Sequence, residues 1–280
     1  MLHKWLILQY QELVHQDIYV EEYYLPQYFG PYAGFLSMIG VLLIQCLLFA
    51  DGGLLALGGN IWNMAFYGCF IGALIWKIFT QNGISKRKIV ASSIISSVLT
   101  LQLGAFSVVI ETLLSGVTKL PFNTFLLAML PIHLAIGLVE GLITLAVLCF
   151  IYETRSEMLW NVENVNLKKE SRISYKKNIA ILACLFIIVG GGISLFASSK
   201  PDGLEWSIEK ITGSTEIEEE ENGVYELSSK IQEKTSFLPD YTFKDTESVV
   251  GTSVSGIVGS LIIVGYIVKL KRKKETTVNE

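Results

Sequence analysis

The sequence predicts an all-α, polytopic membrane protein with about six transmembrane helices and an extracellular acidic loop. Three observations carry this prediction. First, 51% of the 280 residues are hydrophobic and only 17% are charged, whereas a soluble globular chain carries about 25% charged residues. Second, apolar runs of bilayer-spanning length recur along the chain. Third, basic and acidic residues are segregated into different connecting segments.

The apolar runs have the length that a membrane requires. A transmembrane helix needs about 20 mostly apolar residues to cross ~30 Å of hydrocarbon. Runs of this kind cover residues 31–50, 61–79, 89–115, 122–151, 178–198 and 249–268. The third and fourth runs are long enough to tilt or to contain a break. Pro131 favours a kink in the fourth, because proline removes a helical hydrogen bond.

The distribution of charge predicts the orientation of these spans. Clusters of Lys and Arg follow the second span, separate the fourth from the fifth and follow the sixth, and the positive-inside rule makes such clusters cytoplasmic. Six spans satisfy this pattern with both termini cytoplasmic and with the loop 199–248 outside. That loop holds thirteen acids against five lysines, so it can raise the local cation concentration. The alternative for its acidic run 218–221 is a solvated, soluble loop.

The sequence also excludes several classes of function. It contains no Walker A pattern, dinucleotide fingerprint or nucleophile elbow. We therefore predict that the chain is not an enzyme, does not hydrolyse ATP and does not bind nucleic acid. Uphill transport would need a second subunit to supply energy. An intramembrane metal enzyme that uses His133 and Glu140 is disfavoured, because the H-E-x-x-H spacing is absent.

The stretch 49–64 is the first candidate for function, because it carries one acid, two asparagines and four glycines between two apolar runs. Polar, irregular backbone at membrane depth is tolerated only where protein covers it or where it lines a wet cavity. Asp51 is a candidate for a transport path or for orienting a ligand; the alternative is a turn carboxylate in water. Asn60 and Asn63 share a helix face, and we expect Asn60 to cap that helix.

The fourth span contains two ionisable residues of interest, His133 and Glu140. They share a helix face but lie two turns, or ~10 Å, apart. Both cannot bind one ion, because metal–ligand bonds are about 2 Å long. Intramembrane ionisable residues suggest function by default, and the alternative, favoured for Glu140, is a structural group bonded to neighbouring helices. Glu111, near the outer end of the third span, is expected to be interfacial.

Two segments resemble a known family. The first runs Leu48-Phe49-Ala50-Asp51-Gly52-Gly53 and continues as Gly59-Asn60-Ile61-Trp62-Asn63-Met64. It closely resembles the signature of the CbiM/NikM family, the substrate-binding membrane components of energy-coupling-factor cobalt and nickel transporters. The segment 131–144 looks like a later helix of the same family.

A second resemblance covers the C-terminal part. Pro201-Asp202-Gly203-Leu204-Glu205 is similar to the PDGLE signature of the small companion subunit CbiN/NikN, and the segments 238–241 and 251–259 fit that subunit too. The two resemblances, in this order, imply a fusion. They divide the chain into an atypical leader (1–29), a partial CbiM/NikM-like membrane domain (30–155), a cytoplasmic linker (156–177), a CbiN/NikN-like module of two helices with the external loop 199–248 (178–270), and a cytoplasmic tail (271–280).

The resemblance implies a multi-pass subunit in a prokaryotic plasma membrane that imports Co²⁺ or Ni²⁺ and holds no covalently bound cofactor. It also implies a role in supplying cobalamin biosynthesis, with a CbiQ/NikQ-like coupling subunit and CbiO/NikO-like ATPases as partners. The candidates for the transport path are Asp51, Asn60, Asn63, His133 and Glu140. The motif of the companion module comprises Pro201, Asp202, Gly203, Leu204 and Glu205.

The chain departs from the family at its beginning. The family's ligands are the terminal amine, a His at the second position and a His in a Gly-Thr-Ser-Gly-His loop, whereas this chain begins Met1-Leu2-His3 and lacks that loop. We therefore assign no metal ligand from the sequence. A one-base frame shift through the codons of residues 13–17 permits Gly-Thr-Ser-Gly-His, so we interpret residues 1–29 as a poorly ordered, out-of-frame leader. The alternative function is a truncated, non-transporting remnant or assembly partner.

Overall fold

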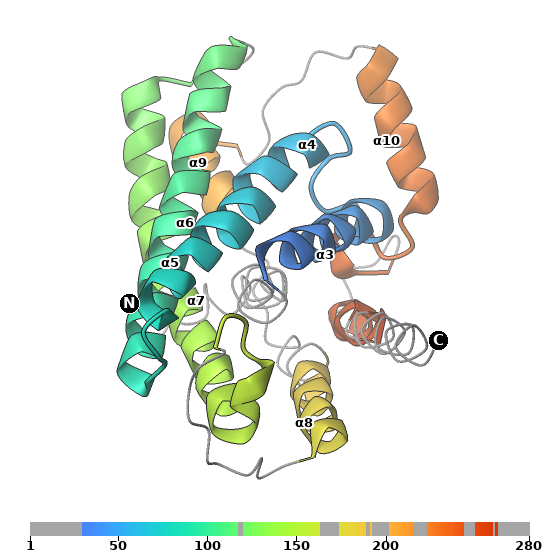
Figure 1. Cartoon of the computed structure of the whole chain (residues 1–280). Coiled ribbons are helices and arrows are strands. Elements are labelled where there is room, and N and C mark those ends of the chain that lie inside the picture. The colour runs from blue at the N-terminus through green and yellow to red at the C-terminus, as the bar shows by residue number, and fades with distance from the viewer. Residues whose placement is uncertain are drawn as a thin grey trace.

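The computed structural model describes residues 30–116, 120–162, 174–188, 191, 202–214, 223–243, 250–259 and 261–262. Helices make up all the regular structure of these residues and no strand occurs among them, so the predicted all-α class is confirmed (Figure 1). The leader 1–29 and the tail 271–280 lie outside the described residues.

Within the part of the chain that the structure describes, four helical segments are long and apolar enough to cross a membrane, and they coincide with the first four predicted spans. They are Pro31–Phe49 (α3 Pro31–Ile44 with η1 Gln45–Phe49), Leu57–Thr80 (α4 Leu57–Asn60, η2 Ile61–Ile71 and α5 Gly72–Thr80), α6 (Lys86–Ser115) and α7 (Phe122–Arg155). The fifth and sixth predicted spans begin with α8 (Tyr175–Ile187) and the short apolar helix Val250–Gly259. Their remaining residues lie mostly outside the described part, so the count of six spans stays a prediction.

Helices α6 and α7 form a closely packed antiparallel pair (Figure 1). Glycine permits the approach: a Cβ built on Gly137 would lie 3.0 Å from the Cα of Val98, and one built on Gly141 would lie 3.0 Å from the Cα of Ile94. Small polar residues line the facing side of α6, where Ser92, Ser93, Ser96, Ser97 and Thr100 are buried. Small residues at the interface are how membrane helices pack without a hydrophobic driving force between them.

The outer surface of the same pair is apolar. On α7, the exposed large residues Leu127, Leu134, Leu138 and Leu142 follow helical spacing. An interior lined by serine and glycine beneath an exterior of leucine is the arrangement expected for helices in contact with lipid rather than with water. Helix α7 also continues through Pro131 without a break. Side chains donate to carbonyls in that turn, with Gln102 Nε2 2.8 Å from Leu130 O.

The first residues of the predicted cytoplasmic linker pack onto the helices. After α7 the chain forms the 3₁₀ turn η3 (Ser156–Met158), and Leu159 is buried. The indole Nε1 of Trp76 donates to the carbonyl of Trp160 at 2.9 Å, and the ring of Trp160 lies against Gly30 at the start of α3. This segment therefore fastens the ends of α3, α5 and α7 together.

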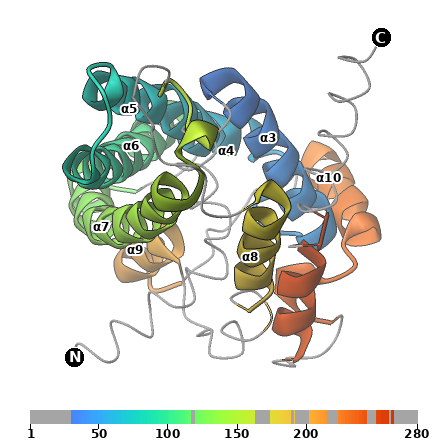
Figure 2. The same ribbon diagram turned by 60° about the horizontal axis from the view of Figure 1, so that its bottom comes forward.

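The C-terminal half contributes helices α9 (Gly203–Thr212) and α10 (Gly223–Thr235) and the short turn η6 (Pro239–Tyr241). Helix α9 lies along α7, whereas α10 and η6 contact η1 at the end of the first span. The two views agree that α9 and α10 lie on opposite sides of the bundle (Figures 1 and 2). The chain after residue 200 therefore returns to the membrane helices at two separate places.

We predict that Gly104→Ala destabilises the fold, because the new Cβ would lie 2.5 Å from the backbone oxygen of Asn63, where η2 crosses α6. The expected cost is about 1–3 kcal/mol, measured as a lower Tm in detergent or nanodiscs. Gly40→Ala in α3 is the matched control, since nothing lies within 4 Å of its Cβ position and alanine favours helix by about 1 kcal/mol. Equal Tm values for the two variants would contradict the close η2–α6 contact.

Candidate functional site

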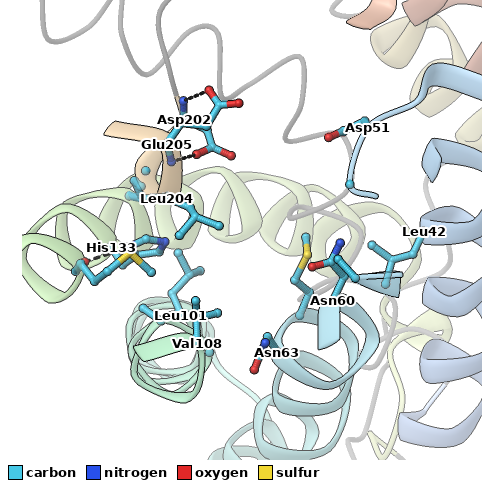
Figure 3. A pocket seen from close by; sticks show the side chains of 18 of the residues that line it. Leu42, Asp51, Asn60, Asn63, Leu101, Val108, His133, Asp202, Leu204 and Glu205 are labelled. Atoms are coloured by element: carbon cyan, nitrogen blue, oxygen red, sulfur yellow. Dashed lines mark hydrogen bonds between the residues drawn. The ribbon is translucent and has the colours of Figure 1, made fainter. Parts of the chain in front are cut away.

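A cavity of about 370 Å³ lies between the first three spans, α7 and the N-terminus of α9 (Figure 3). Four of the five residues predicted for the transport path line it: Asp51, Asn60, Asn63 and His133. The residues of the second motif that the structure describes line it too: Asp202, Gly203, Leu204 and Glu205. Pro201 lies outside the described residues. The fold thus brings together, around one cavity, two motifs that lie more than 130 positions apart in the chain.

The cavity is acidic. Asp51, Asp202 and Glu205 contribute carboxylates to its lining, and none of the described lining residues is a lysine or an arginine. A concave site lined by one sign of charge concentrates counter-ions. The lining therefore favours cations over anions.

Irregular backbone forms one wall of the cavity. The π-helix η1 precedes the loop 50–56, and the short helix α4 and the π-helix η2 follow it. Ala50 ends η1 in a left-handed conformation with φ of 56°. π-Helical turns are rare and are frequent at functional sites. Gly52 also has a positive φ of 65°. The amide nitrogen of Asn60 would lie 2.6 Å from a Cβ at Gly52, so a side chain at that position would collide with Asn60.

Asn60 does not cap its helix, contrary to the prediction. Helix α4 begins at Leu57, so that Asn60 lies inside the helical segment and its backbone N–H bonds to the carbonyl of Ala56. The predicted start was one turn late because glycines 58 and 59 read as a loop, whereas both are helical here. The side chain of Asn60 is thereby free to cover Gly52 at the edge of the cavity.

Asn63 belongs to a polar network on the adjoining wall. Its Nδ2 donates to Glu111 Oε2 at 2.9 Å, Ser107 Oγ donates to Glu111 Oε1 at 3.2 Å, and Trp62 Nε1 donates to Ser107 Oγ at 3.2 Å. Glu111 is exposed, and its position at the membrane interface stays a prediction. Asn63 Oδ1 is buried and has no hydrogen-bond partner among the described residues. The network therefore fixes the orientation of the Asn63 amide at the edge of the cavity.

Asp51 is held by the C-terminal half of the chain. The hydroxyl of Tyr241 donates to Asp51 Oδ2 at 2.6 Å, and Gln45 Nε2 lies 3.0 Å from the same oxygen and 3.1 Å from the Tyr241 hydroxyl. The ring of Tyr241 stacks on Phe49 with centroids 4.8 Å apart. Asp51 is therefore a positioned carboxylate rather than a turn carboxylate in water.

Further contacts bind the same two segments. Gln232 Nε2 donates to the carbonyl of Cys46 at 3.1 Å, and the backbone N–H groups of Phe237 and Leu238 both donate to the carbonyl of Leu48. The last four carbonyls of a helix lack donors within that helix. Residues from more than 180 positions later thus complete the end of the first span.

The second docking point is the N-terminus of α9. Asp202 and Glu205 form a capping box: the N–H of Glu205 donates to Asp202 Oδ1 at 2.7 Å, and the N–H of Asp202 donates to Glu205 Oε2 at 3.2 Å. Gly203 between them rests on α7, since its Cβ would lie 3.1 Å from both His133 Cε1 and Ile136 Cδ1. Ile208 anchors the next turn in a buried cluster with residues of α6 and α7.

Glu140 stands apart from the cavity. It is fully buried (0% exposed) and belongs to the α6–α7 interface, on the face of α7 that carries Gly137, Gly141 and Thr144. The cavity lining does not include it. The structure therefore separates His133, which lines the cavity, from Glu140, which does not.

The described residues contain no group of three or more His, Cys, Asp or Glu side chains arranged to hold a metal ion. Among the described residues, the polar groups that line the cavity are thus separate from one another and do not form a ready-made metal-binding cluster.

Comparisons with known proteins identify the family to which the chain belongs. The family CbiM, described as a cobalt uptake substrate-specific transmembrane region, matches residues 27–158, and the PDGLE domain matches residues 176–273. The chain is 31% identical, over 248 residues, to an Archaeoglobus fulgidus protein named as a fused nickel transport protein NikMN; the match covers 88% of this chain and 74% of the relative. The chain belongs to the CbiM family, in the form fused to a PDGLE domain.

Other relatives cover less of the chain. A fused nickel transport protein LarMN of Lactiplantibacillus plantarum is 28% identical over 190 residues, 65% of this chain and 55% of the relative. A cobalt transport protein CbiM of Sorangium cellulosum is 28% identical over 139 residues, 49% of this chain and 62% of the relative. The chain thus spans from about half to three quarters of the length of these relatives. No solved structure matches it.

Both matched regions contribute residues to the lining, so the cavity lies where the CbiM region and the PDGLE domain meet. Gln45 and Tyr241, which hold Asp51 at this junction, were missed as site residues. The segment that contains Tyr241 was recognised as part of the module, but nothing local in it points to Asp51. The capping box was readable as Asp-x-x-Glu ahead of an apolar helix; the sequence prediction treated those residues only as a signature.

We predict that Tyr241→Phe loosens the junction while it preserves the stacking on Phe49. Loss of the hydroxyl removes a hydrogen bond to a carboxylate, which costs about 1.5–3 kcal/mol when the acceptor is charged. Amide hydrogen exchange in residues 50–56 should accelerate. Tyr32→Phe, at an exposed position on α3, should leave that exchange unchanged. Unaltered protection in Tyr241→Phe would show that the hydroxyl does not hold the loop.

We also predict that Gly203→Ala displaces α9 from α7, because the added methyl group meets the ring of His133. Amides in 203–212 should exchange several-fold faster than in the wild type. Gly223→Ala, at the start of α10, serves as the control within the same domain, since its Cβ position is open. Wild-type exchange in Gly203→Ala would mean that α9 does not depend on this contact.

Proposed function

We propose that this chain is the membrane subunit of an energy-coupling-factor, ABC-type importer for cobalt or nickel ions. In this proposal it resides in a prokaryotic plasma membrane with both termini cytoplasmic, and the imported ion feeds cobalamin biosynthesis. The cavity between the CbiM region and the PDGLE domain is the outer part of the transport path. The observation that carries the proposal is this acidic cavity, to which both domains contribute.

The chemistry of the lining fits a late first-row divalent cation. Asp51, Asp202 and Glu205 supply negative charge, and His133 supplies the nitrogen donor among the lining residues. Imidazole nitrogen suits Ni²⁺ and Co²⁺, whereas Mg²⁺ and Ca²⁺ prefer sites made of oxygen alone. The cavity thus combines attraction for cations in general with preference for metals that bind nitrogen.

The proposed partners follow from what the chain lacks and from its family. The sequence contains no ATP-binding pattern, so a CbiQ/NikQ-like coupling subunit and CbiO/NikO-like ATPases would supply the energy. The names of the relatives include both cobalt and nickel transport proteins, and the lining residues do not choose between the two metals.

A second candidate is a non-transporting assembly partner. One observation favours it: the described residues contain no preformed group of three or more metal donors. In this case the cavity would be a structural junction that docks neighbouring subunits. Uptake by an assembled complex distinguishes the two candidates.

We predict that the chain, co-expressed with CbiQ/NikQ-like and CbiO/NikO-like subunits in cells without their own Co²⁺ and Ni²⁺ importers, supports ATP-dependent uptake of radioactive Co²⁺ or Ni²⁺. Asp51→Asn should reduce the initial rate several-fold, because it removes a fixed charge from the cavity. Glu226→Gln, on the exposed face of α10 and outside the cavity lining, is the matched charge control.

The uptake assay has two informative failures. If the assembled wild-type complex imports neither ion, the assembly-partner function replaces the transport function. If the wild type imports but Asp51→Asn equals Glu226→Gln, the acidic cavity is not the path.

A further inference from the structure

His133 is held in one tautomer. Its Nδ1 lies 2.8 Å from the carbonyl oxygen of Met129, one turn earlier in α7. A carbonyl oxygen can only accept a hydrogen bond, so Nδ1 carries the proton and donates it. In the neutral ring the other nitrogen, Nε2, then bears a lone pair. Met129 is itself buried, which fixes the carbonyl and through it the orientation of the ring.

The nitrogen with the lone pair faces the cavity. Figure 3 shows the ring of His133 on the wall opposite Asp51 and Asn60, beside the capping box of α9. The edge formed by Cε1 and Nε2 lies against Gly203, whose Cβ would be 3.4 Å from Nε2. Any larger residue at that position would cover the nitrogen. The glycine of the PDGLE motif therefore leaves Nε2 next to the open space.

This arrangement is that of a metal ligand. A histidine that binds a metal usually donates its other ring N–H to a carboxylate or backbone carbonyl, which fixes the tautomer and orients the ring. Around His133 the lining is acidic, with Asp202 and Glu205 on the adjoining turn and no lysine or arginine among the described lining residues. Asn63 also lines this cavity, and its Oδ1 is buried without a hydrogen-bond partner among the described residues.

We propose that His133 Nε2 is a direct, transient ligand of the divalent cation as it passes through the cavity. This inference rests on the proposed function and assigns the nitrogen donor within it. Protein side chains do not complete the coordination shell of the ion, because the described residues contain no group of three or more His, Cys, Asp or Glu donors. Water and single carboxylate or amide oxygens fill the remaining positions, so the ion binds weakly and is released readily.

The direct test is spectroscopic. The chain has three histidines, so replacing His3 and His15 with alanine leaves His133 as the single imidazole. The ¹⁵N-histidine-labelled protein in nanodiscs is titrated with Co²⁺. We expect the Nδ1–H proton to persist and to acquire a large hyperfine shift, because the metal binds Nε2 while Nδ1 stays bonded to Met129. An imidazole signal without such a shift at saturating Co²⁺ would overturn the proposal.

Affinity supplies an independent readout. His133→Gln keeps an amide that can donate to Met129 and approximates the volume of the ring, so the fold is preserved. It should raise the Co²⁺ or Ni²⁺ concentration for half-saturation by about tenfold or more. Leu134→Ala, the neighbouring truncation on the lipid-facing side, should leave it unchanged. Equal affinities of His133→Gln and the wild type would also overturn the proposal.

Uptake separates this inference from the proposed function. If the wild-type complex imports Co²⁺ or Ni²⁺, His133→Gln imports at the same rate, and His133 in the labelled protein shows no hyperfine shift, then His133 is a packing residue and the transport function stands. If the wild type neither binds nor imports either ion, the proposed function fails and the inference falls with it.

Discussion

The hydrogen bonds at the end of the first span join the CbiM region to the PDGLE domain. A helix end leaves its last carbonyls without donors, and covering such groups without replacing the lost water is costly. Here Gln232, Phe237 and Leu238 supply donors to the end of η1, and Tyr241 binds Asp51 just beyond it. The acceptors belong to the CbiM region and the donors to the PDGLE domain. The carbonyls at the end of η1 and the donors of residues 232–241 therefore find their hydrogen-bond partners only when the two domains are in contact.

The cavity is a consequence of this two-point docking. The segment 232–241 holds the loop after η1, and the N-terminus of α9 rests on α7 at His133 and Ile136. Between these two points the helices do not close, because the loop 50–56 and the π-wound η1 and η2 interrupt regular helical packing. Helix α6 approaches its neighbours closely at Gly104, which lines the cavity, and opposite Gly137 and Gly141 of α7. The irregular backbone around residues 50–56 thus leaves space where the polar residues gather.

The sequence predicted the first four spans, because hydrophobic length is a strong local signal. Polar groups at membrane depth are costly, and this made Asp51, Asn60, Asn63, His133 and Glu140 the candidates for the transport path; all but Glu140 line the cavity. The sequence could not predict that Tyr241 binds Asp51, since 190 residues separate them and their pairing depends on how the two domains dock. The π-helices were missed because a π turn differs from an α turn by a single residue, without a composition of its own. Glu140 and His133 looked equivalent in the sequence; the contact with α6, invisible from α7 alone, separates them.

In the proposed function, the path of a divalent cation has two opposing requirements, and the lining of this cavity would meet both. Binding must be favourable enough for the ion to lose part of its water, yet weak enough for release. A cluster of three or more fixed donors would satisfy the first requirement and fail the second. An acidic lining attracts the ion from a distance, and a single imidazole nitrogen favours metals that bind nitrogen. Because Asp202 and Glu205 also hold each other as a capping box, committing their oxygens to an ion would weaken the N-terminus of α9. In this proposal, departure of the ion would restore that helix end, so the fold itself would oppose long retention.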